Sequence, residues 1–168
     1  MASAVRNSGM GAPLAFSGQE SFAVPRGPLW RFLTDVRNVP LYSANLRDAR
    51  YPAPATLSAR LKPSFSFVRG ELEITVQFLE PLAEPTAKLS IAAPGVGTKI
   101  FIDASMELAE EAGGAATLLK WEANSRFEGL LSAVSRGLIE GAARKIIADV
   151  FQAIRAHFAT KVSPEGVA

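Results

Sequence analysis

The chain has 168 residues, with 18 Lys plus Arg against 16 Asp plus Glu, no Cys and a single His. This length fits one domain, which buries roughly 70% of the surface that its unfolded chain exposes. Without Cys there are no disulfides, no thiol catalysis and no iron–sulfur cluster, and one His, His157, excludes a metal site built on a His pair. We therefore expect no metal and no cofactor.

Charge and hydropathy along the chain exclude two further classes of protein. Basic residues outnumber acidic ones between residues 37 and 75, but they are spread out and not interleaved with aromatic residues, so we expect no nucleic-acid partner. No apolar run approaches the ~20 residues of a membrane-spanning helix, so membrane contact is expected to be peripheral at most.

The opening segment, residues 1–13, is small and polar and lacks the apolar core of a secretory signal. We expect it to be a flexible leader, and either Met1 or Met10 fits as the natural start. A cytoplasmic location follows as an expectation from the missing signal.

The first third of the chain predicts one strand followed by two short helices. Residues 16–24 alternate between apolar and polar positions, as in a strand, and Pro25 ends the pattern. Apolar residues then recur at helical spacing over 29–33, and a second short helix is expected to end at Tyr42.

The middle of the chain predicts an antiparallel meander, because proline and glycine turns separate its last four alternating segments. The strands expected after the short helices cover residues 46–51, 55–61, 68–78, 87–93, 99–108 and 117–123. In the last strand a shift of one residue would bury two charged side chains. Thr117, Leu119, Trp121 and Ala123 are therefore expected to face inward.

After the meander the period of apolar residues changes from two to 3.6, which predicts a long helix. Ser125 and Glu128 match a capping box, so the helix is expected to run from about residue 127 to residue 160. Gly137 and Gly141 lie within it, and close packing in the core is the expected reason for them.

These elements occur with a set of short motifs whose order and spacing are informative together. The motifs are Gly18, Phe22 and Pro25 ahead of Leu29-Trp30, then Lys62-Pro63 and Gly70, then Gly113, Gly114 and Thr117 before Trp121, and finally Gly129-Leu130, Gly137, Ala143-Arg144-Lys145-Ile146 and Phe151. In these motifs the chain resembles the CoxG family of carbon monoxide dehydrogenase subunits, within the START and Bet v 1-like (SRPBCC) superfamily, from about residue 16 to residue 158.

The resemblance implies an α+β helix-grip fold, in which a curved antiparallel sheet of about seven strands wraps a long C-terminal helix. Two short helices follow the first strand in this fold. We accordingly expect a single helix-grip domain over residues 14–161 and a short tail over residues 162–168.

The resemblance also implies an apolar cavity between the sheet and the long helix. Its expected wall consists of Phe22, Tyr42, Arg47, Leu72, Ile74, Ile100, Ile102, Met106, Trp121, Leu138, Ala142 and Ile146. Within this wall, Tyr42 and Arg47 are expected to hold a polar head group. Small residues at inward positions favour open space, namely Gly18, Ala92, Ala104, Ala123 and Ala142. The alternative is that side chains fill the interior completely.

Two further features leave alternatives open. Glu20 shares a strand face with Phe16 and Phe22, so it is either a candidate catalytic acid inside the cavity or is turned outward by a bulge. Phe65 and Phe67 fall on the face opposite the inward set, so either a bulge switches the face or the two rings form an exposed patch for a partner.

The expected function is the binding of a hydrophobic small molecule, such as a lipid, an isoprenoid or a quinone. The resemblance implies that this binding supports a molybdenum hydroxylase or CO dehydrogenase-type system. Two alternatives are an assembly or adaptor subunit that docks on a larger enzyme complex, and a cyclase- or hydrolase-type enzyme that uses the same cavity. A binding protein without catalysis is favoured over an enzyme, because Glu20 is the sole catalytic candidate.

Overall fold

A seven-stranded antiparallel sheet with one long helix across it forms the protein. The structure is a computed structural model that describes residues 13–167 apart from 64, 66, 69 and 81, with side chains through residue 159. Its strands are β1 (Leu14–Phe22), β2 (Leu46–Ala53), β3 (Thr56–Leu61), β4 (Leu72–Phe78), β5 (Thr86–Gly95), β6 (Thr98–Glu111) and β7 (Ala116–Gly129). Its α-helices are α1 (Arg26–Thr34), α2 (Val39–Tyr42) and α3 (Arg136–Val167). The 3₁₀ helices are η2 (Val36–Asn38), η3 (Ala112–Gly114) and η4 (Leu130–Ala133).

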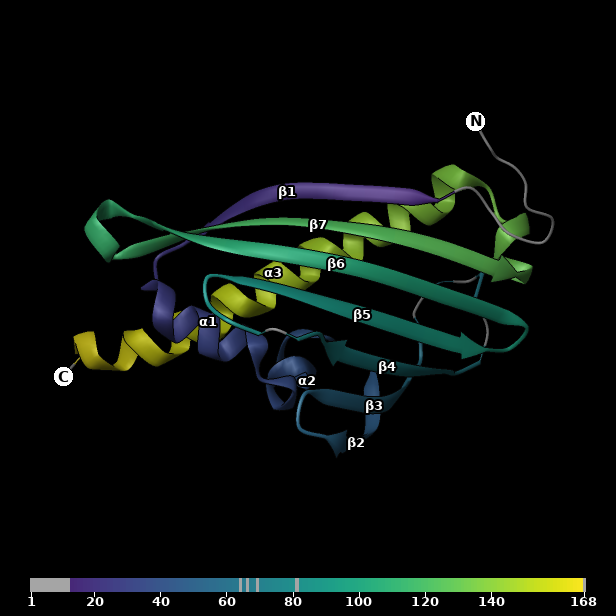
Figure 1. Ribbon diagram of the computed structural model, residues 1–168, viewed down its shortest axis with the longest axis horizontal. Coiled ribbons are helices and arrows are strands. Elements are labelled where there is room, and N and C mark those ends of the chain that lie inside the picture. Colours follow the sequence, from purple (N-terminus) through teal and green to yellow (C-terminus); the bar gives the residue numbers. More distant parts are fainter. Residues whose placement is uncertain (1–12, 64, 66, 69, 81, 168) are drawn as a thin grey trace.

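The strands are ordered β1-β7-β6-β5-β4-β3-β2, so the first strand of the chain pairs with the last. α3 crosses one face of this sheet diagonally, and α1 lies near its C-terminal half (Figure 1). There the ring of Phe32 stacks on His157 with 4.2 Å between centroids. This arrangement confirms the expected α+β helix-grip fold.

The register of β7 confirms the predicted inward set. Thr117 and Leu119 are buried, whereas Lys120 and Glu122, on the other face, are exposed. On the neighbouring strand β6, Met106 lies opposite Trp121. The inner face of the sheet, which faces α3, is therefore the apolar face.

The start of the long helix differs from the prediction. β7 continues to Gly129, and α3 begins at Arg136. Ser125, expected to cap the helix, is buried in β7, where its hydroxyl donates a hydrogen bond to the carbonyl of Leu14 at 3.0 Å. The period of two simply extends through Ser125 and Phe127, and a capping-box spacing can occur by chance within a strand.

The described residues between β3 and β4 lie outside the strands. The strand expected to begin at residue 68 begins at Leu72. The rings of Phe65 and Phe67 stack with 5.6 Å between centroids, and both side chains are half-buried. Phe67 and Val68 pack against the core. Neither a strand bulge nor a fully exposed patch therefore describes the two phenylalanines.

Two clusters of buried side chains hold α3 to the sheet. The first cluster surrounds α1 and includes Leu29, Val36, Leu57, Leu108 and Ile154, all at most 2% exposed. The second cluster lies at the start of α3 and consists of Leu14, Phe16, Phe127, Leu131 and Ile139. α3 contributes Ile154 to one cluster and Ile139 to the other, so it is fixed to the sheet at two places.

α3 has 32 residues, which correspond to about 48 Å of helix. It continues to Val167, past the domain end expected at residue 161. In the described part of the chain, no helix combines the length and the apolar character that a membrane span requires. The expected leader, residues 1–13, lies outside the described residues except for Pro13.

Candidate functional site

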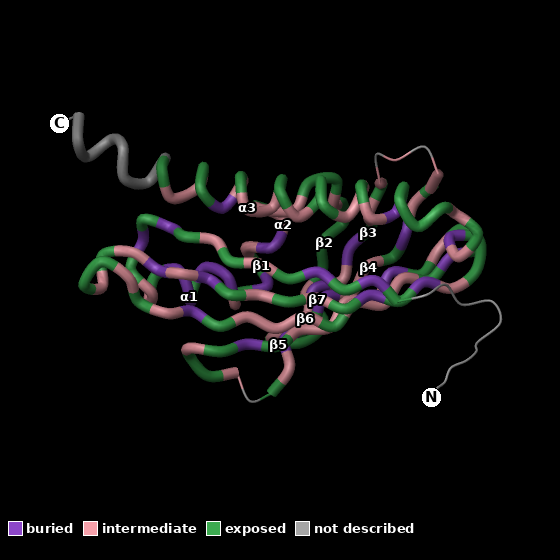
Figure 2. The backbone as a smooth tube through the Cα atoms, turned by 90° about the horizontal axis from the view of Figure 1, so that it is seen from above, coloured by how far each residue is buried: buried purple, intermediate pink, exposed green. Residues whose placement is uncertain are grey.

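Between the two clusters, the facing sides of α3 and the sheet are incompletely buried. Ile146 follows Ile139 by seven residues and precedes Val150 by four, so all three lie on the same side of α3. Ile139 is 8% exposed and Ile154 is 2% exposed, but Ile146 between them is 49% exposed. Figure 2 shows α3 as a separate layer above the sheet, with mostly intermediate and exposed residues along its middle.

We call this region the central interface. On the inner face of the sheet its half-buried members are Gly18, Leu89, Ile91, Ile102, Ala104, Met106, Trp121 and Ala123, and on α3 they are Ala142, Ala143 and Ile147, beside the exposed Ile146. Ala104 and Ala123 lie opposite each other in the register of β6 and β7. Because neither side chain extends beyond Cβ, this pair fills less of the space between the sheet and α3 than larger side chains would.

The expected wall residues divide into three groups. Phe22 and Leu72 are buried at 3% and 1% exposure. The half-buried members are Ile74, Ile100, Ile102, Met106, Trp121 and Ala142. Leu138 is 58% exposed. It directly precedes Ile139, so its side chain points to a different side of α3. Ala92, expected inward, pairs with Phe101 on the outer face, because the inward residues of β5 are Leu89, Ile91 and their alternate neighbours.

The two residues expected to hold a polar head group have protein partners instead. The hydroxyl of Tyr42 donates to the carbonyl of Leu33 at 3.2 Å. Burial, and secondarily the carboxylate of Asp35, raise the pKa of Tyr42 above its ordinary value. Arg47 lies opposite Arg60 on the outer face, and its hydrogen bond to Glu71 holds the pKa of that carboxyl below its usual range.

Glu20 stays on the inner face, because the pairing of β1 with β7 is continuous from Leu14 to Phe22. No bulge turns it outward, so that expectation is wrong. Its carboxylate forms an ion pair with Arg155 of α3, whose guanidinium also lies 4.9 Å from the ring centroid of Phe22. The pair links the edge of β1 to α3. Sequence reasoning missed Arg155, although its spacing of four residues from Phe151 marks the same side of the helix.

Trp121 lies where the central interface meets both clusters, since its indole packs against each of them. On α3 it faces Phe151, with 5.7 Å between ring centroids. On β1 it covers Gly18, which is its partner in the strand register. Trp121 is therefore an aromatic wall of the central interface and connects β7, β1 and α3.

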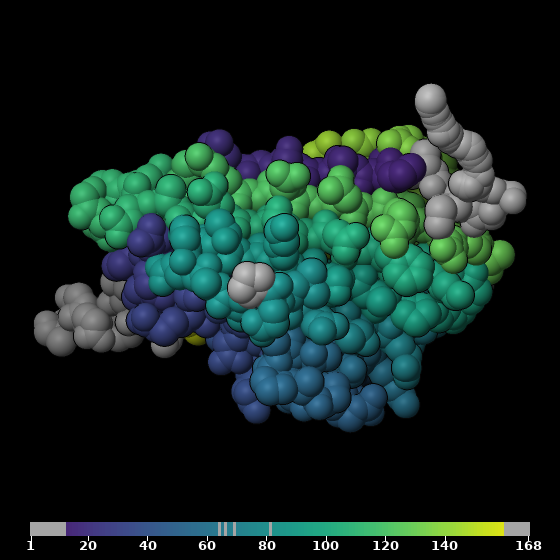
Figure 3. All heavy atoms as spheres, in the orientation of Figure 1, coloured from purple at the N-terminus to yellow at the C-terminus, as the bar shows by residue number. Residues whose placement is uncertain are grey.

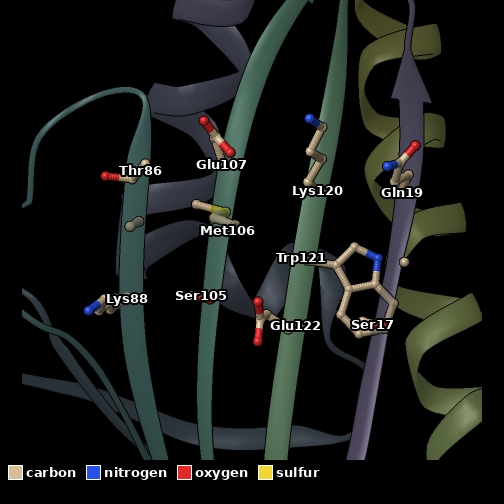
Figure 4. A pocket seen from close by; sticks show the side chains of 12 residues that line it. Ser17, Gln19, Thr86, Lys88, Ser105, Met106, Glu107, Lys120, Trp121 and Glu122 are labelled. Carbon is tan, nitrogen blue, oxygen red and sulfur yellow. The ribbon is translucent and has the colours of Figure 1, made fainter.

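The outer face of the sheet carries an open depression of about 590 Å³. Two rows of outward side chains flank it, Thr86, Glu107, Lys120 and Gln19 in one row and Lys88, Ser105, Glu122 and Ser17 in the other (Figure 4). Figure 3 shows the same face of the molecule, to which β5, β6 and β7 contribute. Polar residues of both charges are typical of a solvated sheet face, so this depression is a weaker candidate for a ligand site than the central interface.

Comparison with solved structures supports the fold. A conserved protein from Geobacillus kaustophilus superposes with a TM-score of 0.80 at 16% identity, and the match covers 88% of this chain and 96% of that chain. A START superfamily protein from Mycobacterium smegmatis gives 0.61 at 12% identity, covering 85% and 95%. Norcoclaurine synthase from Thalictrum flavum, solved in complex with dopamine and hydroxybenzaldehyde, gives 0.58 at 11%, covering 95% and 96%.

Among curated protein sequences there is no significant match. The model of the CoxG family of carbon monoxide dehydrogenase subunits matches residues 18–159, which include every strand from β2 to β7 and most of β1 and α3. The chain therefore belongs to the CoxG family.

Proposed function

We propose that the protein binds a hydrophobic small molecule at the central interface, between α3 and the inner face of the sheet. The observation that carries the proposal is the 49% exposure of Ile146, which lies on the same side of α3 as the buried Ile139. A helix that served the core alone would bury this side along its whole length. Ligand atoms would cover the surface that stays exposed on the half-buried side chains of the central interface.

The lining of the central interface favours an apolar ligand. Aliphatic side chains from β5, β6 and α3 surround the alanine pair, and Trp121 adds an aromatic wall. Covering such surface yields about 25 cal/mol per Å² of apolar area removed from water. Lipids, isoprenoids and quinone-like molecules have the required apolar surface. A solved neighbour, norcoclaurine synthase, holds small aromatic molecules in the same fold, which supports the class of function without identifying a ligand.

The name of the family supports a role beside carbon monoxide dehydrogenase. We further propose that the bound molecule serves a molybdenum hydroxylase or CO dehydrogenase-type enzyme in the same cell. Affinity purification of the tagged protein from its host, followed by mass spectrometry of the bound proteins, tests the link. Purification without any component of such an enzyme would argue against the partner and leave the ligand proposal standing.

Filling the central interface tests the binding site itself. Ala123→Phe places a ring where the alanine pair leaves room, and should weaken the binding of fatty acids or quinones at least tenfold in a fluorescence titration. Asn124→Phe is the matched control, because this neighbouring residue of β7 points to the outer face. It should leave the affinity unchanged. Native mass spectrometry of the wild-type protein should show a bound molecule.

If neither native mass spectrometry nor titration detects binding by the wild-type protein, the proposed function is wrong. If Ala123→Phe and Asn124→Phe bind as well as the wild type, binding occurs away from the central interface.

A further inference from the structure

One buried polar atom of the inner face has no partner. Among the described residues, Nε1 of Trp121 is the buried side-chain nitrogen or oxygen for which no hydrogen bond is formed. The other buried hydroxyls of β7 are satisfied, since Thr117 donates to the carbonyl of Val24 at 2.6 Å and Ser125 donates to that of Leu14. A buried donor without an acceptor is destabilising, so its retention at a candidate ligand site points to a bound acceptor.

Gly18 determines how the indole lies. A Cβ atom at this position would come within 3.1 Å of both Nε1 and Cζ2 of Trp121, which is closer than ordinary van der Waals contact. The glycine therefore lets the indole lie directly over β1. Figure 4 shows the indole nitrogen on the side of the ring that faces β1. The N–H group is thus held at the inner edge of the sheet, beside the central interface.

The surrounding groups restrict the chemistry of an acceptor. An indole N–H is a neutral donor that cannot accept a hydrogen bond. The charged groups of β1 and α3 on either side of Gly18 already have partners: Glu20 pairs with Arg155, and Arg144, which lies over the ring of Phe16, pairs with Glu140. A neutral acceptor oxygen attached to an apolar body therefore fits this position better than an anion, a cation or a pure hydrocarbon.

We propose that Nε1 of Trp121 donates a hydrogen bond to a carbonyl oxygen of the ligand, and so selects carbonyl-bearing apolar molecules over hydrocarbons of the same shape. The proposal rests on the proposed function, because it assigns a ligand class to the same site. Since Nε1 is shielded from solvent, the oxygen reaches it through a small turn of the indole, and binding changes the environment of Trp121.

A pair of probes that differ in the oxygen tests this assignment. The probes are 1-acetylnaphthalene, which carries a carbonyl, and 1-ethylnaphthalene, which does not. In ¹H–¹⁵N spectra of the full chain the two indole N–H signals are distinguished with the Trp30→Phe variant. Both probes should bind, and the ketone alone should move the Trp121 N–H proton downfield. The wild-type protein should prefer the ketone by about fivefold, the factor that corresponds to one net hydrogen bond.

Two variants sharpen the test. Trp121→Phe keeps an aromatic ring without the N–H, and should bring the ratio of the two affinities to about one, whatever its effect on the affinity for each probe. Gly18→Ala pushes the indole away from β1 and so uncovers Nε1, and should keep or raise the preference. The shift measured on the wild-type protein decides the matter even if either variant fails to fold.

If both probes bind with equal affinity and neither moves the Trp121 N–H signal selectively, the assignment is overturned and the proposed function stands. If neither probe binds, and fatty acids and quinones also fail to bind, the proposed function and the assignment fall together.

Discussion

The C-terminal half of α3 and its middle lie on the same helix but differ in what covers them. Ile154 is 2% exposed within the first cluster, whereas Ile146, eight residues earlier, is 49% exposed although it lies on the same side of α3 as the buried Ile139. In the first region Ile154 belongs to the buried cluster, and the rings of His157 and Phe158 pack on Phe32 of α1. The difference separates the stretch of α3 that holds the helix in the core from the stretch at which we propose that a ligand binds.

The largest expected effect comes from shortening the two isoleucines. Ile154→Ala should lower the free energy of unfolding by about 2–5 kcal/mol, because it creates a cavity in the first cluster. Ile146→Ala, the matched change in the central interface, should cost well under 1 kcal/mol and should weaken ligand binding. Urea denaturation followed by circular dichroism measures both. Equal losses of stability would show that the middle of α3 is as tightly packed as its end.

A second comparison concerns the hydrogen bonds of β7. Thr117 is fully buried, and its hydroxyl donates to the carbonyl of Val24. Thr117→Val keeps the shape but leaves that carbonyl unpaired, so stability should fall by about 1–3 kcal/mol. Trp121→Phe removes an N–H that has no partner, and should cost less than Thr117→Val by the same denaturation assay. A larger loss of stability in Trp121→Phe than in Thr117→Val would contradict this contrast between the hydrogen-bonded hydroxyl of Thr117 and the unpaired N–H of Trp121.

A smaller effect, of opposite sign, is expected at Gly141. A Cβ atom there would meet nothing within 4 Å, so the glycine does not serve the close packing that the sequence suggested. Gly141→Ala should therefore raise the free energy of unfolding by roughly 0.5–1 kcal/mol, since alanine loses less backbone entropy in a helix. Thermal unfolding measures the change. Destabilisation would indicate that the middle of α3 packs against another surface.

The smallest effect is expected at the ion pair between β1 and α3. The side chains of Glu20 and Arg155 are 31% and 43% exposed, so the pair is partly screened by solvent. Glu20→Gln should change the free energy of unfolding by at most about 0.5 kcal/mol, and 1 M salt should reduce the difference further. It should leave ligand binding intact. If the wild-type protein converts a substrate and Glu20→Gln loses that activity, the enzyme alternative is supported instead.

The strands of the sheet could be predicted from the sequence because the alternation of apolar and polar residues that marks each strand is a local pattern. The period of two predicts that Thr117, Leu119, Trp121 and Ala123 face inward, and the structure confirms that register. The start of α3 could not be predicted in the same way, since Ser125 continues the strand pattern while it also matches a helix cap. Which interpretation holds depends on its hydrogen bond to Leu14, a residue far away in the sequence.

The candidate site was less predictable than the fold, because it depends on contacts between a helix and strands. Periodicity identified Met106 and Trp121 as inward residues but did not reveal that Arg155 reaches Glu20. Arg47 was expected to face inward, whereas its pairing with Arg60 places it on the outer face. Tertiary packing determines which side chains meet across an interface. The periodicity of apolar residues along one strand or helix carries no information about that packing.

The pairing of β1 with β7 has a consequence for how the chain folds. Leu14 and Ser125 are 111 residues apart in the sequence, yet they are hydrogen-bonded partners in adjacent strands. During synthesis the apolar side chains of β1 cannot pair with β7 until the chain has been made as far as Gly129. Contacts between residues so far apart in the sequence form late and make folding slow. A nascent chain in which β1 is still unpaired is therefore the species most prone to aggregation. Chaperones that hold extended apolar segments should therefore bind this protein at its first strand.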